Sequence, residues 1–127
     1  MFKPRFIPAV AALAIAGAAL TTAPLASAKG GDGVKVGGVC SKNSTSKLKL
    51  KSEDRGLAVE FEVDQNRNGI PWKVTLHRSG SLVASKTAIT RAPSGSFSFE
   101  RVISGTHGKV VAVATRSGER CSATATI

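Results

Sequence analysis

From residue 39 to the C-terminus, apolar and polar side chains alternate on a two-residue period, and clusters of Gly, Pro and polar residues interrupt them at short intervals. Such a pattern is typical of short antiparallel strands joined by turns. We therefore expect an all-β fold, a small antiparallel β-sandwich of immunoglobulin-like type with about seven strands. The expected strands are residues 47–51, 57–63, 72–78, 82–88, 96–102, 110–115 and 121–127.

One phase of the alternation collects the large apolar side chains, which we expect to face the interior between two sheets. Trp72 could be an exposed platform for a ligand, but it is in phase with Val74 and Leu76, which favours the core. The expected inward residues are Leu48, Leu50, Leu57, Val59, Phe61, Val63, Trp72, Val74, Leu76, Phe97, Phe99, Val111, Val113, Cys121, Ala123 and Ala125.

The connection between the second and third expected strands has two interpretations. Asn68-Gly69 is a sequence typical of a tight hairpin turn. Residues 64–71 are also long enough to cross from one sheet to the other, as happens in immunoglobulin-like sandwiches. The sequence leaves both connections open.

Residues 1–28 have the three parts of a secretory signal peptide. Lys3 and Arg5 supply the basic start, an apolar run follows, and Ala26-Ser27-Ala28 forms a small-x-small cleavage site. The apolar run is shorter than the ~20 residues that a bilayer-spanning helix needs. We therefore expect cleavage and secretion, with no transmembrane segment left after cleavage.

The remaining chain divides into two parts. Residues 29–38 contain five glycines and are expected to be a flexible lead-in, with residues 34–36 as the only part that could touch the fold. Residues 39–127 form the expected β-sandwich domain. After cleavage the chain keeps 16 of the 18 Lys and Arg residues and all 8 Asp and Glu residues, so its net charge is +8.

Cys40 and Cys121 are the only cysteines of the chain. Export would place them where a disulfide persists, and neither CxxC spacing nor a neighbouring His points to a metal or redox site. We expect them to pair. In the chain-entropy model, closing a loop of this length stabilises the fold by about 4–5 kcal/mol.

The basic residues fall into two groups. Lys47, Lys49 and Lys51 alternate on the outward side of one expected strand, and Glu60 and Glu62 do the same on the next. If Leu50 is opposite Val59, then Lys49 faces Glu60 and Lys47 faces Glu62, which balances much of this charge. The other basic residues have no acidic residues expected opposite them on a neighbouring strand. They include Lys73, Arg78, Lys86, Arg91, Arg101, Lys109 and Arg116.

This second group predicts a diffuse basic surface, with Lys73, Arg78, Lys86 and Arg91 as candidate binding residues. Outside a cell, it could attract an anionic cell-wall polymer or an acidic extracellular protein in a salt-sensitive way. The alternative is that the charge only aids solubility. Nucleic-acid binding is disfavoured, because the four aromatic residues after the cleavage site are all expected to face the core, which leaves none exposed for base stacking.

Residues 64–69 place oxygen-bearing side chains at alternate positions before a glycine, as calcium loops do. Asp64, Asn66 and Asn68 are the candidate metal ligands. The pattern lacks the carboxylate that would close such a loop, because that position is Thr75. A turn in which Asx side chains bond their own backbone is therefore the favoured interpretation.

We nominate no catalytic residues and no cofactor. His77 and His107 are the only imidazoles and have no partner that the sequence can place beside them. Ser94 and Ser96 flank Gly95 in a turn before a strand, which differs from the Gly-x-Ser-x-Gly elbow of hydrolases.

A set of short motifs gives the chain a family resemblance. They are residues 60–64 (Glu-Phe-Glu-Val-Asp), residues 66–69 (Asn-Arg-Asn-Gly), Trp72, residues 93–97 (Pro-Ser-Gly-Ser-Phe) and Gly118-Glu119 just before Cys121. On these motifs the chain resembles a group of small, uncharacterised secreted proteins of actinobacteria with a single β domain and one disulfide. The resemblance implies export and a small β fold, and it carries no activity to individual residues.

Together these features predict an exported, non-catalytic β-sandwich that binds an envelope or extracellular component through its basic surface. The alternative is a protein-protein interaction module, such as an inhibitor or an assembly component, that uses the loops at residues 64–71 and 91–95.

Overall fold

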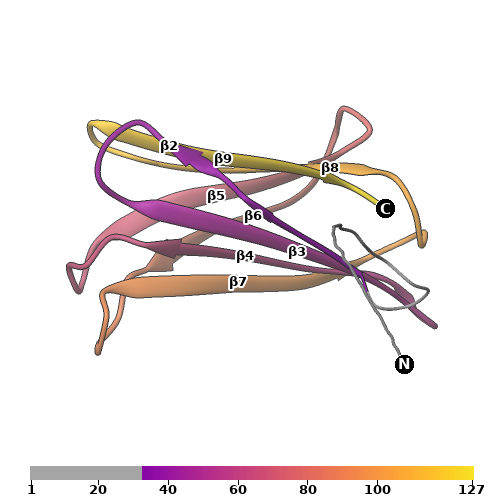
Figure 1. Ribbon diagram of the computed structural model, residues 1–127, viewed down its shortest axis with the longest axis horizontal. Coiled ribbons are helices and arrows are strands. Elements are labelled where there is room, and N and C mark those ends of the chain that lie inside the picture. Colours follow the sequence, from indigo (N-terminus) through magenta and orange to yellow (C-terminus); the bar gives the residue numbers. More distant parts are fainter. Residues whose placement is uncertain (1–32) are drawn as a thin grey trace, which may run out of the picture.

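The computed structural model describes residues 33–127, which form two antiparallel sheets stacked face to face (Figure 1). The expected signal peptide, residues 1–28, and the first four residues of the expected lead-in lie outside the described residues. Between residues 33 and 127 the chain forms no helix, and hence none that could cross a membrane. The all-β sandwich predicted from the alternation is confirmed.

Four strands form the first sheet, in the order β1-β3-β4-β7, and five form the second, in the order β2-β9-β8-β5-β6. All neighbouring strands are antiparallel. The strands are β1 (Val34–Gly37), β2 (Val39–Cys40), β3 (Thr45–Glu53), β4 (Gly56–Asp64), β5 (Pro71–Arg78), β6 (Ser81–Ile89), β7 (Ser96–Ile103), β8 (Lys109–Arg116) and β9 (Glu119–Thr126).

All seven expected strands are present, as β3 to β9, and two short strands precede them. The expectation of about seven strands and of a flexible lead-in through residue 38 therefore needs correction. In β1, Val34 and Val36 pack against the core and pair with Leu50 and Leu48 of β3. The glycines on both sides of β1 favoured a flexible segment, but Val34 and Val36 follow the same two-residue period as the other strands.

The strand order matches the immunoglobulin order in both sheets, apart from the additional strand β1. The run β9-β8-β5-β6 corresponds to the G-F-C-C′ run of variable-type domains. In the four-stranded sheet, β3 pairs with β4, which follows it directly in the chain. The run β3-β4-β7 therefore corresponds to the A-B-E run, and β1 lies beside β3 at the outer edge of this sheet.

The core lies between the sheets and contains most of the expected inward residues. Trp72 and Phe61 are fully buried, and Phe97 packs against Trp72 with 6.2 Å between ring centroids. Gln65 accepts a hydrogen bond from the indole nitrogen of Trp72 at 3.0 Å, so the polar atom of this buried ring has a partner.

The expected phase of β8 is wrong. Val110, Ala112 and Ala114 are buried, whereas Val111 and Val113 lie on the outer side of the sheet and are only partly buried. Both phases of this strand are apolar, so its alternation carries no directional signal. The register decides the phase, because Ala114 pairs with buried Cys121 and Ala112 pairs with buried Leu76.

The predicted disulfide between Cys40 and Cys121 is present. The two cysteines are register partners, so the bond ties the short edge strand β2 to β9 within the five-stranded sheet. It closes a loop with a sequence separation of 81 residues.

Candidate binding surfaces

The predicted binding residues do not form one site. Lys73 points outward near the start of β5, the strand next to the edge of the five-stranded sheet, and Arg91 is exposed in the loop after β6. Arg78 and Lys86 lie on the inward sides of β5 and β6, because their register partners Val110 and Val74 are buried. The diffuse basic surface therefore separates into parts with different roles.

Arg78 is a structural residue rather than a free cation. Its guanidinium donates hydrogen bonds to the carbonyl oxygens of Ser104 and His107. Any side chain larger than hydrogen at Gly105 would collide with this guanidinium. The prediction of Arg78 as a binding residue is therefore corrected: it holds the loop between β7 and β8 against the end of β5.

Lys86 forms a second unexpected cluster with Arg101 at the lateral edge where β6 and β7 lie. The Lys86 ammonium is 5.9 Å and the Arg101 guanidinium 5.3 Å from the centre of the Phe99 ring. Arg101 is opposite buried Val59, so both cations start from inward positions on edge strands. Inward-pointing charges of this kind protect sheet edges from pairing with other chains, and here they also cover the Phe99 ring.

The outer face of the five-stranded sheet carries hydroxyl groups, β-branched side chains and bases. One cross-strand row runs Arg120, Thr115, Lys73 and Thr87. A neighbouring row contains Ser122, Val113, Thr75 and Ser85, and the next contains Thr124, Val111, His77 and Leu82. These rows would not have been found from the sequence, because they follow from the strand order and register.

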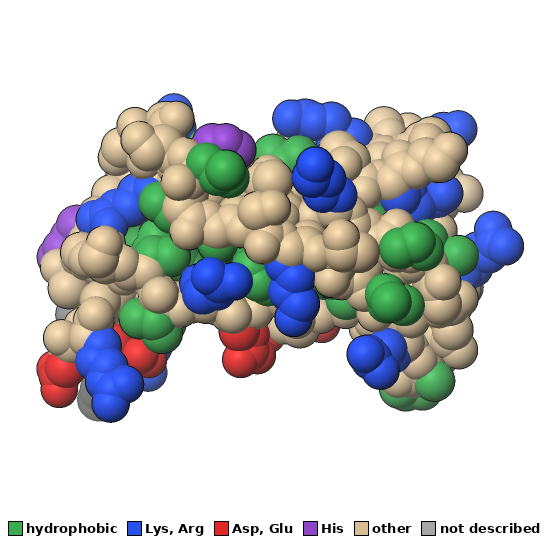
Figure 2. Space-filling view, turned by 180° about the vertical axis from the view of Figure 1, so that it is seen from behind, with side chains coloured by type: hydrophobic (Ala, Val, Ile, Leu, Met, Phe, Trp, Pro, Cys, Tyr) green, Lys and Arg blue, Asp and Glu red, His purple; other side chains and the backbone are tan. Residues whose placement is uncertain are grey.

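Among the residues that the structure describes, the exposed acidic groups lie on the four-stranded sheet or in its β3–β4 turn. Among residues 33–127, six of the seven acidic residues lie on β3, β4, β7 or the turn between β3 and β4: Glu53, Asp54, Glu60, Glu62, Asp64 and Glu100. The seventh, Glu119 of β9, is buried. In the view from behind, Lys and Arg side chains spread over the surface while acidic side chains lie along its lower margin (Figure 2).

Glu119 is a buried carboxylate that the sequence did not reveal. Its oxygens accept hydrogen bonds from the guanidinium of Arg116 at 3.0 Å and from the backbone N–H of Ser44 at 3.2 Å. Burial opposes its ionisation, but these partners outweigh burial and lower the pKa of Glu119. Arg116 also lies over the Trp72 ring, so the ion pair closes one end of the core.

Glu119 also lies close to Cys40 and Cys121, a grouping that resembles a metal site by residue type. The two sulfurs are bonded to each other, so they are not thiolate ligands. These three residues therefore have a structural role: the disulfide and the Glu119–Arg116 ion pair lie together at one end of the core.

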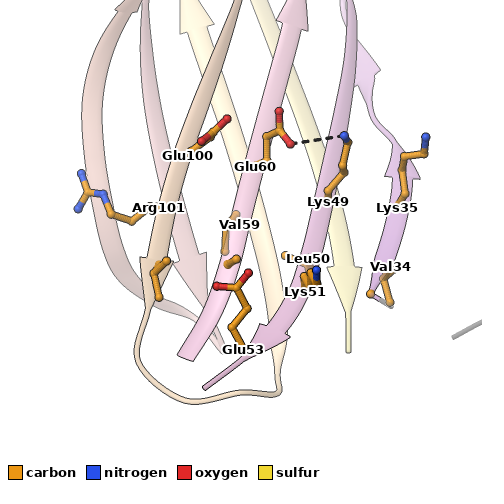
Figure 3. A pocket seen from close by; sticks show the side chains of 13 residues that line it. Val34, Lys35, Lys49, Leu50, Lys51, Glu53, Val59, Glu60, Glu100 and Arg101 are labelled. Atoms are coloured by element: carbon orange, nitrogen blue, oxygen red, sulfur yellow. Dashed lines mark ion pairs between the residues drawn. The ribbon is translucent and has the colours of Figure 1, made fainter. Parts of the chain in front are cut away.

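The outer face of the four-stranded sheet is hollowed into a trough (Figure 3). A cavity of about 810 Å³ lies over β1, β3, β4 and β7, and a second of about 470 Å³ continues it toward the other end of β1 and β3. The predicted charge pairs lie in this trough: Lys49–Glu60 at 3.4 Å and Lys47–Glu62 at 3.3 Å. The register predicted from Leu50 opposite Val59 is confirmed.

The loops at residues 64–71 and 91–95 pack against each other. The first is a crossing from β4 to β5 in the other sheet, which settles the two interpretations of this segment. Buried Thr90 accepts a hydrogen bond from the N–H of Ile70 and donates one to the carbonyl of Arg67. Gln65 donates its backbone N–H to the carbonyl of Gly95 at 2.9 Å. The two loops are thus braced into one end of the sandwich.

Within the first loop, Asp64 accepts a hydrogen bond from the backbone N–H of Asn66 at 3.1 Å. This is the Asx turn that the sequence favoured over a calcium loop. Asn66 has a φ of 64°, a conformation that Asn adopts more readily than most residues. Asn66 and Asn68 are both exposed, with Asp64 at the end of β4.

Comparisons with protein-family models, with curated proteins and with solved structures find no match to this chain.

Proposed function

We propose that the protein is an exported, non-catalytic binding module that holds an anionic polymer of the cell envelope on the outer face of its five-stranded sheet. The observation that carries this proposal is the separation of charge. Described exposed acids are confined to the four-stranded sheet and its turn, whereas Lys73, Lys109 and Arg120 point outward from the five-stranded sheet. A surface with charges of one sign attracts polyanions more strongly than a mixed surface of the same net charge.

Hydroxyl groups between the bases support the same proposal. Thr115 lies between Arg120 and Lys73 in one row, and Thr87 follows Lys73 on β6. Strands are spaced by about 4.8 Å, so Arg120 and Lys73, two strands apart, lie about 10 Å from each other. A chain of phosphate or carboxylate groups could contact both cations and accept hydrogen bonds from the hydroxyls between them.

Aromatic residues argue against binding by stacking. The four aromatic side chains between residues 33 and 127 are all buried: Phe61, Trp72, Phe97 and Phe99. Carbohydrate rings and nucleic-acid bases are commonly held on exposed aromatic faces, so this surface favours a ligand recognised by charge.

The test is retention of the protein on purified anionic wall polymer as a function of salt. The double variant Lys73→Glu/Arg120→Glu should elute at much lower salt than the wild type, because two of the outward cations become anions. The matched control is Lys51→Glu/Arg55→Glu, which makes the same change in net charge on the four-stranded side. Equal elution of the two double variants would refute a role for this face.

The braced loops favour a second candidate function, a protein-protein interaction module. A loop surface fixed before binding loses little conformational entropy on association. Arg67 and Arg91 are both exposed at this end. This candidate expects capture of a defined extracellular protein that persists at high salt and is lost in Arg67→Glu/Arg91→Glu. Retention that disappears at high salt for every partner would argue against it.

A further inference from the structure

The trough on the four-stranded sheet has the features of a second binding site, independent of the basic face. Its floor is apolar, because Ala58 is short and Val102, 49% exposed, lies beside it in the register. Longer charged side chains surround this floor: Lys51, Glu53, Glu60 and Glu100 (Figure 3). The hollow therefore combines an apolar base with groups of both signs at its rim.

Charge in the trough changes sign across the strands. One cross-strand row runs Lys35 on β1, Lys49 on β3, Glu60 on β4 and Glu100 on β7. The next row places Lys51 opposite Ala58. In these two rows the charges on β1 and β3 are positive and those on β4 and β7 are negative, and Glu53 lies beyond them at the end of β3.

The charges at the two sides are not satisfied within the described protein. Lys35 is opposite Lys49, and Glu60 is opposite Glu100, so both outer pairs of the row oppose like charges. Such pairs destabilise a sheet. Only the inner pair, Lys49–Glu60, makes an ion pair in this row, and none is formed by Lys35, Lys51, Glu53 or Glu100 among residues 33–127. A dipolar ligand would relieve both repulsions at once.

The size of the trough sets the length of that ligand. Lys35 and Glu100 are three strand spacings apart, about 14 Å between their backbones. Long side chains from both sides shorten the distance that a ligand must span. An extended peptide covers about 3.3–3.6 Å per residue, so three residues reach about 10 Å.

We propose that this trough binds a short peptide of about three residues that carries both a free ammonium and a free carboxylate. The peptide lies over Ala58 and Val102, with its ammonium toward Glu100 on β7 and its carboxylate toward Lys51 on β3 and Lys35 on β1. The charge complementarity selects the dipolar peptide over an anionic polymer, because the acidic side of the trough repels a polyanion.

The probe for this proposal is trialanine, titrated at low ionic strength and followed by amide NMR shifts of the isotope-labelled protein. Trialanine should give saturable shifts in β3, β4 and β7, with Kd on the order of 1 mM. N-acetyl-trialanine and trialanine amide each lack one terminal charge, so each should bind about threefold more weakly.

Two variants locate the site. Glu100→Gln should bind trialanine about threefold more weakly while leaving the affinity for N-acetyl-trialanine unchanged. Ala58→Met fills the hollow and should abolish saturable shifts for both peptides. Lys73→Gln, on the other sheet, is the control and should bind like the wild type. Cooperative thermal unfolding at or near the wild-type temperature, with the small gain expected for Glu100→Gln, establishes that these surface variants are folded.

Three outcomes would overturn the proposal. The first is equal binding of the free and blocked peptides, and the second is a set of shifts confined to other surfaces or absent. The third is a change in the same amide shifts with protein concentration alone, because a second copy of the chain would then occupy the face. The salt-dependent retention on wall polymer tests a different sheet, so either proposal can fail without the other.

Discussion

The two sheets share one core but use their other faces differently. The four-stranded sheet presents Lys and Glu side chains in rows, with cations on β1 and β3 and anions on β4 and β7. The five-stranded sheet presents hydroxyls, valines and a few bases. Side chains on the outer face of a sheet do not have to pack in the core. The two sheets can therefore have different outer surfaces although both direct alternate apolar residues inward.

The sheets also differ in how their stability is secured. The five-stranded sheet contains the disulfide, the buried Glu119–Arg116 ion pair and Trp72. The ion pairs of the four-stranded sheet, Lys47–Glu62 and Lys49–Glu60, are solvent-accessible, and such pairs contribute little. We therefore expect large losses from changes inside the five-stranded sheet and small effects, of either sign, on the outer face of the other.

The largest effect should come from removing the disulfide. Cys40→Ser/Cys121→Ser frees a loop of 81 residues in the unfolded chain and should lower the free energy of unfolding by about 4–5 kcal/mol. Denaturant unfolding at neutral pH measures it. A loss below about 1 kcal/mol would mean that the bond adds little to the five-stranded sheet.

The second-largest effect should come from the buried indole of Trp72, at the end of the core that Arg116 covers. Trp72→Ala should cost about 3–5 kcal/mol, because a fully buried ring leaves a cavity between the sheets. Trp72→Phe serves as the control and should cost less, since it keeps an aromatic ring beside Phe97. If both variants unfold at the wild-type denaturant concentration, the packing described here is wrong.

The buried ion pair should give a smaller, pH-dependent effect. Glu119→Gln should lower stability by about 1–3 kcal/mol at pH 7, because it removes the anion that Arg116 and Ser44 bind. The pKa of Glu119 is lowered in the folded state, so its contribution is present above the ordinary glutamate pKa of about 4.3. It is lost as pH falls through the lower folded value.

Thermal melts of wild type and Glu119→Gln between neutral and acidic pH measure this dependence. The two melting temperatures should converge toward the acidic end. A constant gap over the whole range would show that the variant acts through packing instead of charge.

The smallest expected effect is an increase in the free energy of unfolding. Glu100→Lys replaces the like-charge pair Glu60/Glu100 by an opposite-charge pair across β4 and β7, and should stabilise the fold by about 0.2–1 kcal/mol. Glu100→Gln should give part of this gain. Denaturant unfolding at low salt measures both variants, and the gain should shrink at high salt. A destabilised Glu100→Lys variant would contradict the described repulsion.

Much of this molecule follows from the chain alone. The two-residue alternation located all seven long strands and the register of β3 against β4, because a one-residue slip would turn every leucine of β3 out of the core. Two cysteines without a metal or redox pattern predicted the bond between Cys40 and Cys121. These features depend on local periodicity and on composition, which a sequence displays directly.

The remaining features depend on which strands become neighbours. The inward phase of β8, the burial of Glu119 and the loop contacts of Arg78 all arise from pairs far apart in the chain. The sequence predicted Lys86 to be a free surface base, but it lies over the Phe99 ring because β6 is an edge strand beside β7. The charge separation between the sheets is likewise a result of strand order. Local pattern determined the strands, and non-local pairing alone decided which surfaces their side chains share.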